Sequence, residues 1–255
     1  MGFQTWLQIQ VNWRDEPGLW LLGSFLLYVL ASNVAWILGR KRSGPLGRAV
    51  ESLQAWPGSH WLVLLLRWAY FVGPPYAMLL LGIISPRWMG LGEVDWVHGA
   101  GTGSAVAAAA LGLLSLSWWS YRRALPVRQN DVGAPFAPRP LGWLLVLMET
   151  AALQAHWAFC RSGFITQTWL DDPYWGSWAG WALVCLEWAL NPWLRHGLRQ
   201  PDEAEPILRR TVMALVTTTL FIFTRNLCLC WALHALFEAW AEYGSFSTGH
   251  FFPET

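Results

Sequence analysis

Residues 211–240 read TVMALVTTTLFIFTRNLCLCWALHALFEAW, the longest apolar run of the chain. A helix over all 30 of these residues would be about 45 Å long, whereas the hydrocarbon core of a bilayer is about 30 Å thick. Thr224, Arg225 and Asn226 interrupt the run near its middle with polar, turn-forming side chains. The segment is therefore either a long tilted helix or two shorter helices joined by a turn, and we predict a bend or break near residues 224–226.

Five further apolar runs precede this segment, each close to the length of a membrane-spanning helix: residues 18–38, 61–84, 100–119, 141–160 and 175–194. The 255-residue chain is 55% hydrophobic and 13% charged, which is too few charges for the surface of a soluble domain. We predict an all-α fold, a polytopic transmembrane helical bundle of about six to seven spans, forming a single integral membrane domain over residues 1–255. The net charge of +1 gives no reason to expect nucleic acid as a partner.

Arginine and lysine gather after the first, third and fifth runs: Arg40, Lys41, Arg42, Arg48, Arg122, Arg123, Arg128, Arg139, Arg195, Arg199, Arg209 and Arg210. The other flanks hold only Arg14, Arg87 and Arg161. Because cytoplasmic loops carry an excess of basic residues, we expect residues 40–59 and 122–140 to face the cytoplasm and residues 87–99 the other side. Alternation of six spans then places both termini on the non-cytoplasmic side, although a broken last segment would return the C-terminal tail. We expect location in the inner membrane of a bacterium.

The chain contains 21 tryptophans, and many of them stand at the ends of the apolar runs. Indole rings prefer the membrane–water interface, where the ring and its single N–H donor are both accommodated. An aromatic belt is therefore the first interpretation. The alternative is that some of these rings stack on a pigment, a quinone or a neighbouring subunit.

Three local patterns concern the shape and packing of the spans. Pro74 and Pro75 should kink or break the second span, because proline removes a backbone donor and clashes with the preceding turn. The small residues from Gly101 to Ala110 should allow close packing of the third span. Cys228 and Cys230 form a CxC pattern with only His234 nearby, so we read them as buried small residues rather than zinc ligands.

Ionisable side chains at membrane depth are costly unless they are paired, and they are therefore candidates for function: Arg67, Glu149, His156, Glu187, Arg225, His234 and Glu238. Counting from the cytoplasmic ends of the spans, Glu149 and Glu187 should lie at similar depth and pair with arginines between helices. His156, His234 and Glu238 should lie in the opposite half. They form either an interhelical hydrogen-bond cluster or a metal site or general base.

The stretch from Arg209 to Trp240 resembles the C-terminal helices of the CPBP family, the CAAX-protease and bacteriocin-processing (Abi) membrane proteins. In that family a helix ends in a turn of the type T-G-N/S-L-W, and the next helix carries H-x-x-x-N. Residues 224–227 look like that turn, and His234 looks like the histidine. Glu238 stands where the family usually has asparagine.

Two further family motifs match less closely. HWAFCRSG, residues 156–163, is similar to E-E-x-x-x-R-G if Arg161 is the motif arginine, and His156 and Trp157 then replace the two glutamates. A second register places Glu149 on a motif glutamate, with Leu153 or Gln154 at the arginine position. On the fifth span, Leu183 and Glu187 have the spacing of F-x-x-x-H without its histidine.

These departures favour a non-catalytic protein, because the resemblance implies that the missing glutamates and histidine activate the attacking water. We expect a CPBP-like structural or accessory subunit of a larger membrane complex, with lipids and other membrane subunits as partners and no favoured cofactor. Its kept polar residues would serve packing: Arg161, Glu187, Arg225 and Asn226. The alternative is an intramembrane protease with rearranged residues, which could bind zinc: Glu149, His156, His234 and Glu238. A weaker alternative is a pigment- or quinone-associated subunit, because a membrane histidine can ligate such a group.

Overall fold

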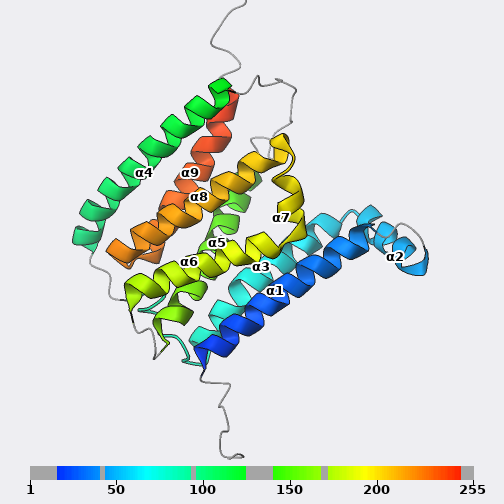
Figure 1. Ribbon diagram of the computed structural model, residues 1–255, viewed down its shortest axis with the longest axis horizontal. Coiled ribbons are helices and arrows are strands. Elements are labelled where there is room, and N and C mark those ends of the chain that lie inside the picture. Colours follow the sequence, from blue (N-terminus) through cyan, green and yellow to red (C-terminus); the bar gives the residue numbers. More distant parts are fainter. Residues whose placement is uncertain (1–15, 41–43, 93–95, 125–139, 168–171, 248–255) are drawn as a thin grey trace, which may run out of the picture.

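The computed structural model describes residues 16–40, 44–92, 96–124, 140–167 and 172–247. These residues form helices and no strand: α1 Pro17–Arg40, α2 Gly44–Ala55, α3 Ser59–Leu80, α4 Trp96–Ala124, α5 Pro140–Ile165, α6 Pro173–Leu190, α7 Pro192–Gly197, α8 Pro201–Thr224 and α9 Leu227–Ser247. The expected all-α fold is therefore confirmed (Figure 1). Each of the first five apolar runs lies largely within one long helix, and the last run is divided between α8 and α9.

Among the described residues, four stretches are long and apolar enough to cross a membrane: Pro17–Arg40, Ser59–Leu80, Gly99–Ser117 and Glu203–Thr224. Leu227–Ala241 in α9 is a shorter apolar helix. Their apolar side chains point largely outward; on α1, for example, Leu22, Leu26 and Leu30 are all more than half exposed. An apolar outer surface of this kind suits lipid as the solvent and would be unfavourable in water.

The predicted break in the last segment is confirmed. α8 ends at Thr224, and Arg225 adopts the left-handed conformation with φ 50°. The Arg225 N–H donates to the carbonyl of Phe221 at 2.8 Å, and the side-chain oxygen of Asn226 accepts from the Leu229 N–H at 3.1 Å, which caps α9. The chain reverses there, so that α8 and α9 form a helical hairpin (Figure 1).

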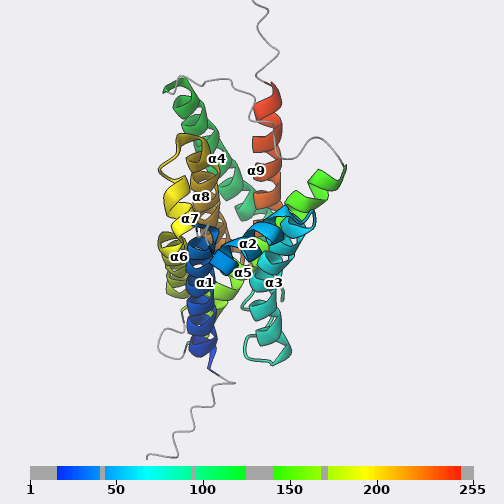
Figure 2. The ribbon, with the colours of Figure 1, turned by 90° about the vertical axis from the view of Figure 1, so that its right-hand side faces the viewer.

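This hairpin changes the expected arrangement of the two ends. α1 begins at the lower end of the molecule and α9 ends at the upper end in both views (Figures 1 and 2). The described ends of the chain therefore lie at opposite ends of the bundle, which fits the alternative in which a broken last segment returns the C-terminal tail. The physical reason is that the break at residues 225–226 divides the last apolar run into two antiparallel helices. The terminal residues 1–15 and 248–255, the basic residues Lys41, Arg42, Arg128 and Arg139, and the loop 125–139 lie outside the described residues.

Helix α5 is the central element and packs against α1, α3, α6 and α9. Its closest approach is to α6, where a Cβ added at Gly180 would lie 2.6 Å from the N and Cα atoms of Arg161. Gly176, one turn earlier, lies against the backbone of Ile165 in the same way. The two glycines form a G-x-x-x-G pattern that allows the two backbones to approach each other.

The local patterns expected on α3 and α4 are met in part. Pro74 and Pro75 lie inside α3, which continues to Leu80, so the prolines do not break the helix. On α4, Gly103 faces side chains of α8 and α9, whereas Gly101 has open space beside it. The close small-residue packing expected on α4 is therefore found at Gly103, and the α5–α6 contact is closer still.

Candidate functional site

His156 and Glu187 form a buried pair between α5 and α6. Nε2 of His156 lies 2.8 Å from Oε2 of Glu187, and both side chains are 2% exposed. The Sγ of Cys160, one turn along α5, lies 3.8 Å from the same Nε2. The Tyr70 hydroxyl of α3 donates to Oε1 of Glu187 at 3.5 Å, and its ring lies 5.4 Å from the imidazole. Three residue types that ligate metals thus meet in a dry environment.

The geometry limits what this cluster can do. Glu187 and Cys160 both approach Nε2 of His156, while Nδ1 has no hydrogen-bond partner. A catalytic thiol with histidine and acid needs the thiol and the acid on opposite ring nitrogens, so the arrangement is not a catalytic triad. The ligand atoms of His156, Cys160 and Glu187 lie within 4.8 Å of one another, which is a donor set of the kind that zinc accepts. A metal would have to replace the hydrogen bond between His156 and Glu187.

A second group of polar residues lines a cavity of about 270 Å³ between α3, α5, α8 and α9. Glu149 of α5 is held there by basic and aromatic donors: Arg67 at 2.6 Å, the indole N–H of Trp68 at 2.8 Å, and Arg210 at 3.8 Å. The expectation that Glu149 pairs with an arginine of another helix is confirmed, whereas Glu187, for which the same was expected, pairs with His156. The charges on this side of the cavity are therefore largely neutralised.

The other side of the cavity is built on α8 and α9. Glu238 lies 2.8 Å from Arg209 and 3.8 Å from Nε2 of His234. The Gln154 amide nitrogen donates to Nδ1 of His234 at 3.2 Å, and the Trp157 ring stacks on the imidazole at 5.1 Å. Nε2 of His234 and Oε1 of Glu238 have no hydrogen-bond partner within 3.5 Å, so the cavity presents two polar atoms that can bind water or a ligand.

The structure divides the sequence-predicted residues differently from the expectation. Glu149, His234 and Glu238 line the cavity, but His156 belongs to the separate pair with Glu187. His156 and His234 do lie at similar depth, since Gln154 and Trp157 of α5 both contact His234, but they belong to different contacts. The predicted level of Glu187 is wrong, because it lies beside His156 and not beside Glu149. The reason is that α6 ends one turn after Glu187, whereas α5 continues well beyond that level. Counting from helix ends cannot detect such a difference in length.

The residues expected to serve packing do not meet in one cluster. Arg161 is buried, its Nη1 donates to Thr218 at 3.4 Å, and its guanidinium lies over the Phe221 ring. Arg225 stands in the α8–α9 turn near the Trp88 ring, where partial burial lowers the pKa of its guanidinium. Asn226 caps α9 beside it, and Glu187 is paired with His156. Each of the four stabilises a different contact.

Several side-chain contacts of these sites were not predicted from the sequence. The four-residue spacing of His156 and Cys160 places both on one face of a helix and was available as a signal. Gln154 and Trp157, which fix the imidazole of His234, gave no such signal because their partner lies on another helix. Arg209 and Arg210 read as loop residues by their charge, yet they lie inside α8.

Comparison of the chain with protein-family models, curated proteins and solved structures found no match.

Proposed function

We propose that this chain is a non-catalytic membrane protein with a CPBP-like C-terminal half, which serves as a structural or accessory subunit of a membrane complex. The observation that carries the proposal is the buried pair of His156 and Glu187. In the register set by Arg161, His156 stands at the position of the family's first glutamate, and Glu187 stands at the position of the family's next histidine. The two residue types are exchanged between α5 and α6 and are bonded to each other.

This pair supports a structural role more than a catalytic one. A general base needs a free lone pair directed at a water molecule. Nε2 of His156 is engaged by Glu187, and neither side chain is open to solvent. In the cavity, the carboxylates of Glu149 and Glu238 are each held by a guanidinium. The polar groups therefore bind one another between helices, as expected of residues that fix packing in a membrane.

The turn between α8 and α9 supports the resemblance itself. Arg225 occupies the position of the family's glycine, and its backbone adopts the left-handed conformation that favours glycine. The α8–α9 turn therefore has the backbone conformation of a glycine turn, although arginine occupies the position. Asn226 caps the following helix, in keeping with the N/S of the family turn.

The second candidate is an intramembrane endopeptidase that uses the cavity. Three of the four residues named for an active enzyme, Glu149, His234 and Glu238, line this one cavity. The free Nε2 of His234 faces Glu238 and could bind a water molecule or a metal ion there. His156 takes no part in this arrangement.

We place the protein in a bacterial inner membrane, with the end of the bundle that carries the end of α1, α2 and α7 toward the cytoplasm. The four apolar helices support the membrane location. Basic side chains at this end support the orientation, because Arg40, Arg48, Arg195 and Arg199 all lie there. In this orientation the end of α9 also faces the cytoplasm.

Activity assays on the purified protein separate the two candidates. We expect no cleavage of a quenched prenylated CAAX peptide or of an unmodified membrane-inserted peptide, with or without added zinc. His234→Ala should lower the unfolding temperature, whereas His60→Ala, at the exposed rim of the same cavity, should not. Cleavage that disappears in a folded His234→Ala protein, and persists in His60→Ala, would establish the endopeptidase instead.

The subunit role has its own test. Mild-detergent extraction from native membranes followed by native mass spectrometry should show the chain in a complex of fixed stoichiometry. Recovery of the chain alone from membranes in which it is made at its natural level would contradict this role.

A further inference from the structure

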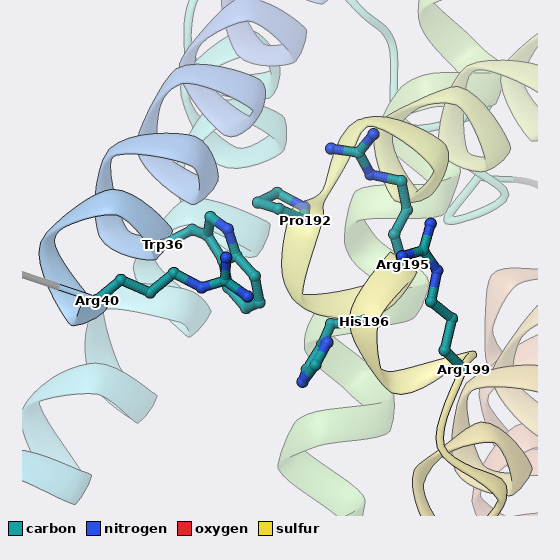
Figure 3. Close-up of a pocket in the computed structure, with 6 residues that line it drawn as sticks. All are labelled: Trp36, Arg40, Pro192, Arg195, His196 and Arg199. Atoms are coloured by element: carbon teal, nitrogen blue, oxygen red, sulfur yellow. The ribbon is translucent and has the colours of Figure 1, made fainter.

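A strongly basic pocket of about 260 Å³ lies between the C-terminal end of α1 and the short helix α7 (Figure 3). It is lined by Trp36, Arg40, Pro192, Arg195, His196 and Arg199. Arg40 lines it from α1, Arg195 from α7 and Arg199 from the turn after α7, and no carboxylate is among the lining residues. None of the three arginines forms an ion pair with a carboxylate in the part of the chain that the structure describes. This differs from the cavity near His234, where Arg67 and Arg209 are paired.

The walls of the pocket are held in place by contacts between α1 and the α6–α7 junction. The Asn191 amide donates to the Tyr28 hydroxyl of α1 at 2.7 Å, and the side-chain oxygen of Asn191 caps α7 by accepting from the Trp193 N–H. The Trp36 ring meets Trp193 edge-on at 4.6 Å. These contacts fix the spacing between Arg40 on one wall and Arg195 and Arg199 on the other.

The pocket offers several hydrogen-bond donors to an anion. The Arg40 guanidinium lies 4.0 Å over the Trp36 ring, which orients this long side chain. Nε2 of His196 accepts from the Gln200 amide at 2.8 Å, so that Nδ1 of a neutral ring carries the N–H. Guanidinium groups recognise phosphate oxygens by paired hydrogen bonds, and here they are supplied from two sides.

The position of the pocket favours a lipid as the source of the phosphate. α1 is a candidate membrane span that ends at Arg40, so the pocket lies where the headgroup layer would begin. Leu30, Val34 and Ile37 form an exposed apolar stripe on α1 that leads along the helix toward Arg40. A lipid can place its phosphate among the arginines and an acyl chain along this stripe.

We propose that this pocket binds the phosphate group of an anionic phospholipid at the basic end of the bundle. Basic pockets between membrane helices recognise headgroups in this way. Arg40, Arg195 and Arg199 supply the charge, His196 supplies a further donor, and Trp36 and Pro192 form the apolar floor.

Native mass spectrometry of the delipidated full-length protein tests the proposal with phosphatidylglycerol as the probe. We expect phosphatidylglycerol to bind in preference to phosphatidylcholine. Arg195→Gln and Arg199→Gln should each weaken its binding about fivefold. Arg48→Gln removes an exposed arginine from α2 at the same end of the bundle, and it should leave binding unchanged.

Further measurements distinguish the source of the phosphate and guard against misfolding. Inorganic phosphate and glycerol phosphate should displace the lipid only at far higher concentration. Displacement by inorganic phosphate at the same concentration as the lipid would make this a site for free phosphate and overturn the lipid assignment. Arg195→Lys and Arg199→Lys keep the charge and should keep most of the binding. Equal binding by the Arg199→Gln and Arg48→Gln proteins, both monodisperse in gel filtration, would overturn the site itself.

Discussion

At the scale of single residues, the contact between His156 and Glu187 is the one on which the proposed function rests. Both side chains are buried, so the removal of either leaves the other without its partner in a medium that solvates it poorly. Loss of one partner of a buried pair costs about 3–5 kcal/mol, whereas the intact pair adds little net stability over apolar residues. Its value therefore lies in specifying how α5 and α6 align.

An exchange of the two residues tests whether the pair acts through packing. His156→Ala and Glu187→Ala should each destabilise the protein by about 3 kcal/mol, and His156→Glu combined with Glu187→His should recover a large part of that loss. Thermal or denaturant unfolding in a fixed detergent measures these differences. Cys160→Ala serves as the control, because its thiol lies at 3.8 Å and contributes less. An exchanged protein no more stable than the single variants would show that the two positions are not coupled.

The sequence predicted some residue contacts because a local signal existed. Glu149 was expected to pair with an arginine between helices, since an unpaired charge at membrane depth is costly, and its partner is Arg67. The pairing of His156 with Glu187 was not predicted, because the depth of Glu187 depends on where α6 ends. The left-handed backbone conformation of Arg225 was not predicted for a different reason. Such turns are normally located from a glycine, and here the position is occupied by arginine.

At the scale of elements, the α5–α6 contact holds the central helix in place. Gly180 lies against the backbone of Arg161 and Cys160, so the two helices touch along their main chains. Such contact relies on van der Waals packing, because lipid supplies no hydrophobic driving force between helices. Glycine is therefore required at position 180, because the α5 backbone leaves no room for a side chain there.

Gly180→Ala should force α5 and α6 apart and destabilise the protein by about 1–3 kcal/mol. Gly112→Ala on α4 is the matched control, because a Cβ there meets nothing within 4 Å. It should be neutral or stabilising by up to about 1 kcal/mol, since alanine favours the helix. Unfolding midpoints of the two variants in the same detergent give the comparison. A Gly180→Ala protein as stable as Gly112→Ala would show that the helices yield without cost.

Element boundaries were predicted where hydrophobicity alone decides them. The long helices follow the apolar runs, and the break at residues 224–226 follows from length and a charged triplet. α2 and α7 were missed because a search for runs of about 20 apolar residues passes over short helices. α2 is a 12-residue amphipathic helix, and α7 has only six residues, from Pro192 to Gly197.

At the scale of the whole molecule, the helical hairpin of α8 and α9 places the end of α9 at the end of the bundle opposite the start of α1 (Figure 1). The residues that line the His234 cavity and the basic pocket come from the helix halves nearer the ends of α1 and α6. The turn between α8 and α9 lies at the opposite end of the bundle (Figure 1). The sequence shows the asymmetric distribution of basic residues, but it left open whether the last apolar run forms one helix or two. The break at residues 225–226 therefore decides at which end of the bundle α9 finishes.

Cysteine labelling in sealed inner-membrane vesicles tests this arrangement. Cys228 is exposed near the start of α9, so a Cys228→Ser background removes the most accessible native thiol. In that background we expect Ser247→Cys, at the end of α9, to react with a membrane-impermeant maleimide from the cytoplasmic face. Gly92→Cys, in the segment that follows α3, should react only from the other face. The physical basis is that charge asymmetry fixes one end of the bundle in the cytoplasm, and the antiparallel α8 and α9 then fix the tail. Reaction of both cysteines from the same face would mean that α8 and α9 do not both cross the membrane, and the orientation of the bundle would have to be rebuilt from six spans.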